Sequence, residues 1–419
     1  MRIRRLLSAV VGAIAFVLVP GRVAAQASTA SPVSFGLDVF LERLPDWAVG
    51  KRLGLITNHT GIDRAGRSNI DLLTARRDVK LVALFAFEHG IRGDAPPGQP
   101  IANTVDARTG LPVYSLYGEV REPTPQMLDG VDLLVYDVQD VGARPYTRVS
   151  TMALSMQAAA KQGIPFVVLD RPNPLGGVEV EGPTLEPAFA SFVGMYPIPL
   201  RHGMTVGELA RMYNERFGIG ADLRVVPVRG WRRSQRFAAT GLPWVGTSPN
   251  IQRLEAALIY PGTVLLEGTN LSEGRGSAFP FEQTGAPWLK SDEVAQAMNA
   301  LSLPGVRVDA VRFDVAKDAA KYGGLTIPGV RLVVTDPETF RPVRTALHLL
   351  DVIHRLHPAE FAWSGAGRSP PAMLTIDRNA GTDRVRKAVE SGTLDDLLRR
   401  SDDDAAAFRA LRAPYLLYH

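Results

Sequence analysis

The sequence predicts an α/β protein with a doubly wound parallel sheet, followed by a smaller α+β domain. Between residues 51 and 171, short and nearly continuous apolar runs alternate with helical patterns. Such runs are typical of strands that are covered on both faces, and the β-α-β alternation favours a parallel sheet. A polar cluster also follows each of these runs, as expected where strands end beside a ligand crevice.

The elements of this first region are predicted in chain order. Strands are expected at 52–57, 80–87, 132–137 and 165–170, with helical stretches at 69–77, 125–128 and 147–162. We place this domain at 35–200. No long linker marks its end, so the boundary is drawn where the alternation stops.

The second region, 201–419, mixes helices with strands. Thr205 and Glu208 form a capping-box pattern that opens a helix to about residue 217. Strands are expected at 223–228, 306–315 and 329–335, and a short extended piece at 263–266. Further helices are expected at 251–259, 292–301, 343–356, 383–390 and 402–411.

The N-terminus has the pattern of a secretory signal peptide. Arg2, Arg4 and Arg5 precede an apolar run from Leu6 to Val19, and small residues stand at 25 and 27. We expect a signal peptide at 1–27, a linker at 28–34 and a periplasmic or secreted protein. An uncleaved anchor is the alternative. The absence of cysteine excludes a lipidated cysteine, disulfides and thiolate metal sites.

Composition and missing motifs exclude several functions. Four of the 47 basic residues lie in 1–27, so the remainder carries 43 basic and 43 acidic residues. This neutral balance does not suggest nucleic acid or an anionic membrane. No Walker loop or dinucleotide fingerprint indicates a nucleotide, and no Gly-x-Ser-x-Gly elbow indicates a serine hydrolase. His354 and His357 are read as a solvated face because no metalloprotease motif accompanies them. We expect no metal and no cofactor, as the family resemblance given below also implies.

The polar clusters contain the candidate catalytic groups. Glu88 follows an apolar run, where burial would raise its pKa and suit a general acid; the alternative is a pair with Arg92. Asp137, Asp140 and Asp170 end neighbouring strands and could act as base, nucleophile or charge stabiliser. They could equally be paired with Arg144 and Arg171.

A Gly-rich segment from Glu267 to Ser277 is the densest polar stretch of the second half. Asn270 and Arg275 suit recognition of amide, hydroxyl and carboxylate groups, and Glu267 and Glu273 lie six residues apart. A solvated glycine-rich loop is the other interpretation.

Taken together and in order, these motifs resemble the NamZ-type exo-β-N-acetylmuramidases. The motifs are Asn58–Gly61, Phe87–Gly93, Tyr114–Gly118, Asp137–Thr147, Asp170–Pro174, Arg201–Thr205, Pro249–Asn250 and Glu267–Gly276. The resemblance runs from about residue 35 to the C-terminus. It implies a Rossmann-like N-terminal domain, a cleft between the two domains, and release of terminal β-linked N-acetylmuramic acid (MurNAc) from fragments such as MurNAc-GlcNAc.

The resemblance also assigns site residues. Glu88 is the expected acid/base, and Asp170, Asp140, Glu273 or the substrate's own acetamido group supplies the second catalytic function. Other positions of the motifs are expected to contact substrate: Asn58, His59, His89, Arg92, Asp137, Gln139, Arg144, Tyr146, Arg171, Asn173, His202, Asn250, Glu267, Asn270 and Arg275. Arg92, Arg144, Arg171 and Arg275 are the arginines available to bind the lactyl carboxylate of MurNAc.

Two other functions fit the same residues. One is another hydrolase of wall amino sugars, either an N-acetylglucosaminidase or an endo-muramidase. The other is a non-catalytic periplasmic sugar-binding protein, because two α/β domains around a cleft also suit capture.

Overall fold

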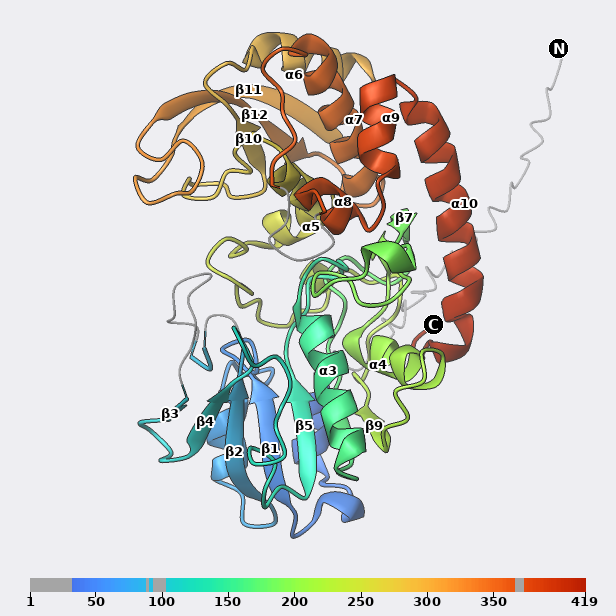
Figure 1. Cartoon of the computed structure of the whole chain (residues 1–419). Helices are drawn as coiled ribbons and strands as arrows, with labels where there is room; N and C mark the ends of the chain where they lie inside the picture. Colours follow the sequence, from blue (N-terminus) through green and yellow to red (C-terminus); the bar gives the residue numbers. More distant parts are fainter. Residues whose placement is uncertain (1–31, 88–89, 93–102, 366–372) are drawn as a thin grey trace, which may run out of the picture. The chain divides into compact units, whose positions relative to one another are not determined.

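The first half of the chain builds a seven-stranded sheet, seen in the lower part of Figure 1. The structure is a computed structural model that describes residues 32–87, 90–92, 103–365 and 373–419. The four predicted strands are confirmed as β1 (Arg52–Thr57), β2 (Lys80–Ala86), β5 (Leu133–Asp137) and β6 (Phe166–Leu169). Three further strands complete the sheet: β3 (Thr104–Val105), β4 (Pro112–Ser115) and β9 (Leu223–Val226).

The strand order is β3-β4-β2-β1-β5-β6-β9, and every pair except β3 with β4 is parallel. The chain therefore runs outward from β1 through β2 to β4, and then returns to β5 and runs outward on the other side. This change of direction confirms the doubly wound prediction. It also places the carboxyl ends of β1 and β5 at the point where open α/β sheets bind ligands.

Helices cover both faces of this sheet. On one face, α1 (Gly36–Glu42) and α2 (Asn69–Thr74) pack against Leu53, Leu55 and Val135 of the strands. On the other, α3 (Arg148–Lys161) and α4 (Val206–Glu215) pack against β-strand side chains such as Phe85, Tyr136 and Phe166. The apolar strand runs are buried on both sides for this reason.

Two elements beyond residue 200 belong to these layers. The predicted capping box begins α4: Thr205 Oγ1 accepts from the Glu208 N–H, and the Glu208 carboxylate accepts from the Thr205 N–H. The strand β9 then pairs in parallel with β6. The expected division at residue 200 thus falls before α4, which covers the large sheet, and before β9, which belongs to it.

The C-terminal half forms a three-stranded antiparallel sheet with helices packed on it. The strand order is β10 (Gln283–Gly285), β12 (Thr326–Val334) and β11 (Val306–Asp314). The helices α6 (Ser291–Ala300) and α7 (Pro342–Leu356) share its apolar core. This half also contains α5 (Leu254–Thr263), the 3-10 helix η4 (Val264–Gly268), α8 (Thr375–Ala380), α9 (Arg384–Ser391) and α10 (Leu394–Arg412). Before it in the chain, β7 (Glu181–Thr184) and β8 (Pro199–Arg201) form a separate antiparallel pair.

Three sequence expectations are wrong in detail. Residues 125–130 form turns rather than a helix, because Gly130 (φ +76°) ends the segment after a single turn. The stretch 263–266, expected to be extended, ends α5 and opens η4. A short apolar run does not distinguish these states by periodicity. Finally, α10 starts at Leu394, eight residues before the expected 402.

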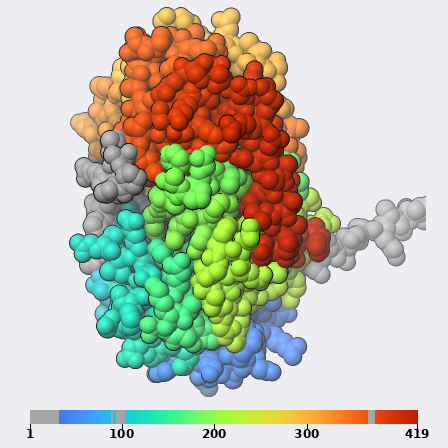
Figure 2. Space-filling model, turned by 45° about the vertical axis from the view of Figure 1, so that its right-hand side comes forward, coloured from blue at the N-terminus to red at the C-terminus, as the bar shows by residue number. Residues whose placement is uncertain are grey.

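The last helix returns from the C-terminal half to the first. In Figure 2 the red surface of α10 runs down along green and yellow-green residues of the first half. Arg412 at its end donates to the carbonyl of His202 (2.9 Å), and Tyr418 donates to Asp170 Oδ2 (2.6 Å). Across the described part of the chain, no helix combines the length and apolarity that a membrane crossing requires.

Candidate active site

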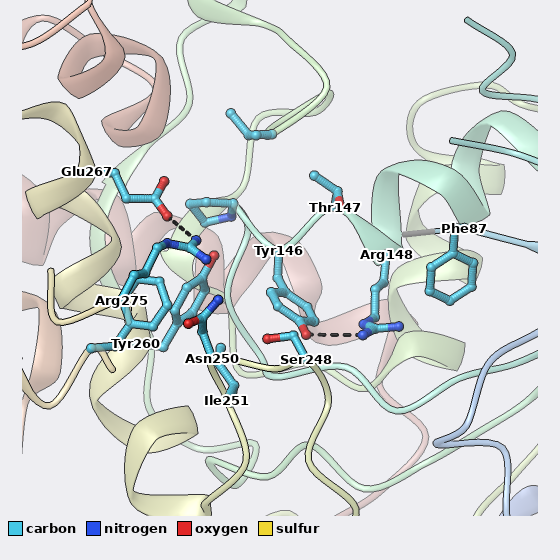
Figure 3. Close-up of a pocket in the computed structure, with 13 residues that line it drawn as sticks. Phe87, Tyr146, Thr147, Arg148, Ser248, Asn250, Ile251, Tyr260, Glu267 and Arg275 are labelled. Atoms are coloured by element: carbon cyan, nitrogen blue, oxygen red, sulfur yellow. Dashed lines mark hydrogen bonds and ion pairs between the residues drawn. The ribbon is translucent and has the colours of Figure 1, made fainter. Parts of the chain in front are cut away.

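A pocket opens beside the carboxyl edge of the large sheet, and residues from both halves of the chain line it (Figure 3). The first half contributes Phe87 after β2, the β5–α3 loop, the first residue of α3 and Val193 between β7 and β8. The second half contributes the loop before α5, α5 itself, η4, the Gly-rich segment and Phe281. The lining residues are Phe87, Pro145, Tyr146, Thr147, Arg148, Val193, Ser248, Asn250, Ile251, Tyr260, Glu267, Arg275 and Phe281.

The pocket gathers four of the residues predicted from the sequence: Tyr146, Asn250, Glu267 and Arg275. Tyr146 is fixed on two sides. Its hydroxyl donates to Thr247 Oγ1 (2.8 Å), and its ring packs edge-on against Tyr260, with 5.6 Å between centroids. Aromatic faces beside polar groups suit a sugar ring, which presents an apolar face and a rim of hydroxyls.

Glu267 and Arg275 form one side of the pocket. Arg275 Nη2 donates to Glu267 Oε1 (2.7 Å), and Arg275 Nε lies 3.1 Å from Glu273 Oε1. Burial opposes the charge of Arg275, but Glu267 and Glu273 outweigh burial and raise its pKa. Glu273 also pairs with Lys321 Nζ (2.9 Å), so two cations hold its two oxygens. Glu273 lies behind Arg275 rather than on the pocket wall.

Arg148 is a pocket residue that sequence reasoning missed. It is the first residue of α3 and is 4 % exposed. Its guanidinium lies 5.0 Å from the ring centroids of both Phe87 and Tyr146, and Nη2 donates to the Tyr146 hydroxyl (3.2 Å) and to the Thr247 carbonyl. The available signal was its position directly after the Arg144–Tyr146–Thr147 cluster.

Asp137 and Arg171 form a buried ion pair at the ends of β5 and β6. Arg171 Nε donates to Asp137 Oδ1 (2.6 Å), both side chains are at most 1 % exposed, and Asn69 donates to the other oxygen (2.8 Å). Arg171 also donates to the Ile62 carbonyl and lies over the Phe35 ring. Neither residue lines the pocket, and the switch point between β1 and β5 is occupied by this pair.

Asp170, a candidate second catalytic group, is bound by four donors. Its Oδ1 accepts from the N–H groups of Arg171 and Gly207, and its Oδ2 accepts from the hydroxyls of Thr205 and Tyr418. Burial raises its pKa to about 6 in spite of these bonds. The carboxylate therefore joins β6, the start of α4 and the C-terminus, and it does not line the pocket.

Asp140 is equally buried but has fewer partners. Its Oδ2 accepts from the Gly142 N–H (2.7 Å), while Oδ1 has no hydrogen-bond partner in the described structure. Burial raises its pKa to about 6, against the opposing charge of Arg148. His202 Nε2 lies 3.9 Å from Oδ2, and burial with neighbouring arginines lowers the pKa of His202 to about 3. Because His202 Nδ1 accepts from the Met204 N–H, its Nε2 carries the proton.

The remaining candidates hold loops in place. Arg144 donates to the carbonyls of Pro183, Ile198 and Asn379, and burial lowers its pKa to about 9. Gln139 and Asn173 donate to the carbonyls of Pro172 and Met204 respectively. Asn58 accepts from Thr60, and His59 Nε2 lies 2.7 Å from the Gly246 carbonyl oxygen.

Two other predicted substrate-binding residues, Arg92 and Asn270, bond to groups outside the pocket. Arg92 pairs with Asp106 (3.0 Å) and approaches Asp71 (3.7 Å). Asn270 bonds to the backbone of Glu360 and Ala362. Glu88 and His89 lie outside the described residues, although Phe87, which precedes Glu88 in the chain, lines the pocket.

No group of three or more His, Cys, Asp or Glu side chains able to hold a metal ion occurs among the described residues. The pocket offers instead a carboxylate, two arginines, an amide and several rings. This set can bind a polar saccharide, orient it against aromatic faces and present a carboxyl group to a glycosidic bond.

Comparison with known proteins identifies the family. Two family models described as exo-beta-N-acetylmuramidase NamZ match the chain, the N-terminal one over residues 53–255 and the C-terminal one over 258–418. The peptidoglycan beta-N-acetylmuramidase NamZ of Bacillus subtilis (strain 168) is 45% identical over 394 residues, which span 94% of this chain and 93% of that protein.

Solved structures agree with this match. A crystal structure of a DUF1343 family protein from Bacteroides fragilis superimposes with a TM-score of 0.84 at 35% identity, covering 93% of this chain and 99% of that one. A second DUF1343 protein from the same organism gives a TM-score of 0.70 at 30% identity, with the same coverage. The chain belongs to the NamZ family of exo-β-N-acetylmuramidases.

Proposed function

We propose that this protein is an exo-acting glycosidase that releases non-reducing terminal β-linked MurNAc from peptidoglycan-derived fragments. One observation carries the proposal: the pocket is assembled from residues of both segments that match the NamZ family models. Neither segment alone supplies the whole set of rings, arginines and carboxylate. The Bacillus subtilis relative named for this activity matches across both segments.

The acid/base role goes to Glu88. It directly follows Phe87, a pocket residue, and stands in the Glu-His-Gly motif of the family resemblance. A general acid placed beside the leaving oxygen typically contributes about 10²- to 10⁴-fold to the rate.

Glu267 is the carboxylate of the described residues that lines the pocket. Its oxygens accept from Arg275 and from Asn379 (3.2 Å), and its side chain is 26% exposed. Of the carboxylates, Glu267 is therefore better placed than Asp140, Asp170 or Glu273 to meet substrate. The alternative to a second carboxylate of the protein is the substrate's own acetamido group, which would act as the nucleophile.

We further propose that the protein acts outside the cytoplasmic membrane on saccharides such as MurNAc-GlcNAc. The basic start, the apolar run and the small residues at 25 and 27 support an exported chain. Peptidoglycan fragments occur in that compartment, so export would bring the pocket to its substrate.

The test compares para-nitrophenyl β-MurNAc with its β-GlcNAc counterpart, using the purified protein and Glu88→Gln. Release from the MurNAc substrate, reduced at least about 100-fold in the variant, is expected from loss of a general acid. Preferential release from the GlcNAc substrate would make the protein an N-acetylglucosaminidase. Cleavage of polymeric glycan without release from either small substrate would indicate an endo-muramidase. Binding of MurNAc-GlcNAc with no cleavage would contradict a glycosidase.

A further inference from the structure

Arg148 carries a buried positive charge for which the described structure offers no direct counter-charge. The residue is 4 % exposed, and no carboxylate among the described residues lies within the 4.0 Å of an ion pair with it. Burial raises the pKa of Asp140 and the charge of Arg148 acts from a distance to lower it, but Asp140 accepts its hydrogen bond from Gly142 and not from Arg148. Buried charges in proteins are normally paired, because removing an ion from water is costly.

Two of its donor nitrogens also lack acceptors. Nη2 donates to the Tyr146 hydroxyl and the Thr247 carbonyl, whereas Nε and Nη1 have no hydrogen-bond partner within the part of the chain that the structure describes. Buried donors without partners are rare in folded proteins and call for a specific explanation. A ligand that brings an anionic oxygen into the pocket would satisfy both the charge and the donors.

The guanidinium is held ready for such a ligand. Phe87 and Tyr146 each place a ring 5.0 Å from it, and the Nη2 bonds fix its orientation at the start of α3. Figure 3 shows Arg148 beside Phe87 and Tyr146 at one side of the pocket, away from the Glu267–Arg275 pair. A preorganised donor loses little freedom when its ligand arrives.

Arg275, the other arginine of the pocket lining, differs in this respect. It lies 2.7 Å from Glu267 and 3.1 Å from Glu273, so two carboxylates already neutralise it. An incoming carboxylate would be repelled by those two acids at Arg275, whereas at Arg148 it would supply the missing negative charge.

We propose that Arg148 binds the lactyl carboxylate of the terminal MurNAc residue and thereby selects MurNAc over GlcNAc, which lacks that group. The inference rests on the proposed function and deepens it by naming a specificity-determining residue. It also replaces the four arginines expected from the sequence, since Arg92, Arg144 and Arg171 do not line the pocket and Arg275 is already paired.

The test measures kcat/KM for para-nitrophenyl β-MurNAc and for the same compound with its lactyl group converted to the carboxamide. The unmodified protein is expected to prefer the carboxylate by about 10- to 100-fold, the range for hydrogen bonds to a charged group. Arg148→Gln is expected to abolish this preference. Arg148→Lys keeps the positive charge and should retain part of the preference for the carboxylate. This variant replaces Arg148→Gln in the test if the glutamine variant fails to fold.

A matched control is Arg253→Gln, which removes an arginine outside the pocket that pairs with Glu282. Its preference for the carboxylate should equal that of the unmodified protein. Arg148 would be only structural if Arg148→Gln slowed both substrates equally and left the preference intact. Equal cleavage of both substrates by the unmodified protein would also overturn the inference while leaving the muramidase activity standing. Failure to cleave either MurNAc compound would instead refute the proposed function, and the inference with it.

Discussion

Two buried arginines near the carboxyl edge of the same sheet differ in charge balance: Arg171 is paired with a carboxylate, and Arg148 is not paired with any carboxylate of the described residues. At the ends of β5 and β6, the guanidinium of Arg171 meets the carboxylate of Asp137 at 2.6 Å, and the pair is closed to solvent. In the pocket, the buried guanidinium of Arg148 meets no carboxylate of the described residues. Residue types alone do not separate these two arginines. Charge balance separates them. A paired arginine stabilises the fold, whereas a buried arginine without a counter-charge is a candidate to bind an anionic ligand.

The largest effect should come from breaking the Arg171–Asp137 pair. Asp137→Ala leaves Arg171 buried without its partner, and such a loss costs about 3–5 kcal/mol of unfolding free energy. Urea denaturation of the variant and the unmodified protein measures this difference. A loss below about 1 kcal/mol, typical of exposed pairs, would place Asp137 outside the scaffold.

Asp140 is a buried carboxyl group with fewer hydrogen bonds than Asp170, so the pH dependence of stability should show how much its ionisation costs. Its pKa of about 6 in the folded protein exceeds the ordinary 3.8, so the folded state holds the proton more tightly. The contribution of Asp140 to stability is therefore greatest below about pH 4, falls as the pH rises through about 6, and is constant above about pH 7. Asp140→Asn stays neutral and should not show this fall.

The stability difference between Asp140→Asn and the unmodified protein should shift in favour of the variant by up to about 3 kcal/mol between about pH 3 and about pH 7, at about 1.4 kcal/mol per pKa unit. Thermal unfolding across that pH range measures it. The unmodified protein serves as reference, because other groups such as Asp170 titrate alike in both. Parallel curves would show that Asp140 ionises without penalty.

Within the pocket, Glu267→Gln should lower activity without unfolding the protein. The change removes a charge that faces the pocket and weakens the bonds from Arg275 and Asn379, but Arg275 keeps Glu273. We expect kcat/KM on the MurNAc substrate to fall by about 10- to 100-fold, with the melting temperature little changed. Full activity in the variant would remove Glu267 from substrate contact.

The smallest effect is expected at an exposed pair that involves neither arginine. Lys387 and Asp383 lie one helical turn apart at the start of α9, with the lysine side chain 63% exposed. Lys387→Gln should cost about 0.3–0.5 kcal/mol at low salt and less at high salt. A loss above 1 kcal/mol would mean that water screens this surface less than assumed.

Much of the fold follows from the sequence, because periodicity reports which face of an element is buried. The strands β1, β2, β5 and β6 and the capping box at Thr205 were predicted within one or two residues. The edge strand β3 and its neighbour β4 were missed, since strands of two to four residues carry little pattern.

The site was harder to predict than the fold. Asp137 and Glu267 both belong to polar motifs. Asp137 is fully buried at the end of β5, whereas Glu267 lines the pocket. A sequence records that a side chain is charged but not which partner neutralises it. Arg148 was missed for the same reason, because its distinguishing feature is a partner that is absent.

The bond from Tyr418 to Asp170 joins residues 248 positions apart. Tyr418 also accepts from the N–H of Val228, next to the last strand of the large sheet. The hydrogen bonds that Asp170 accepts at the end of β6 can therefore be complete only after the last residues of the chain have been synthesised. Such distant closure makes folding slow. We expect the growing polypeptide to lack this closure until its synthesis is nearly finished.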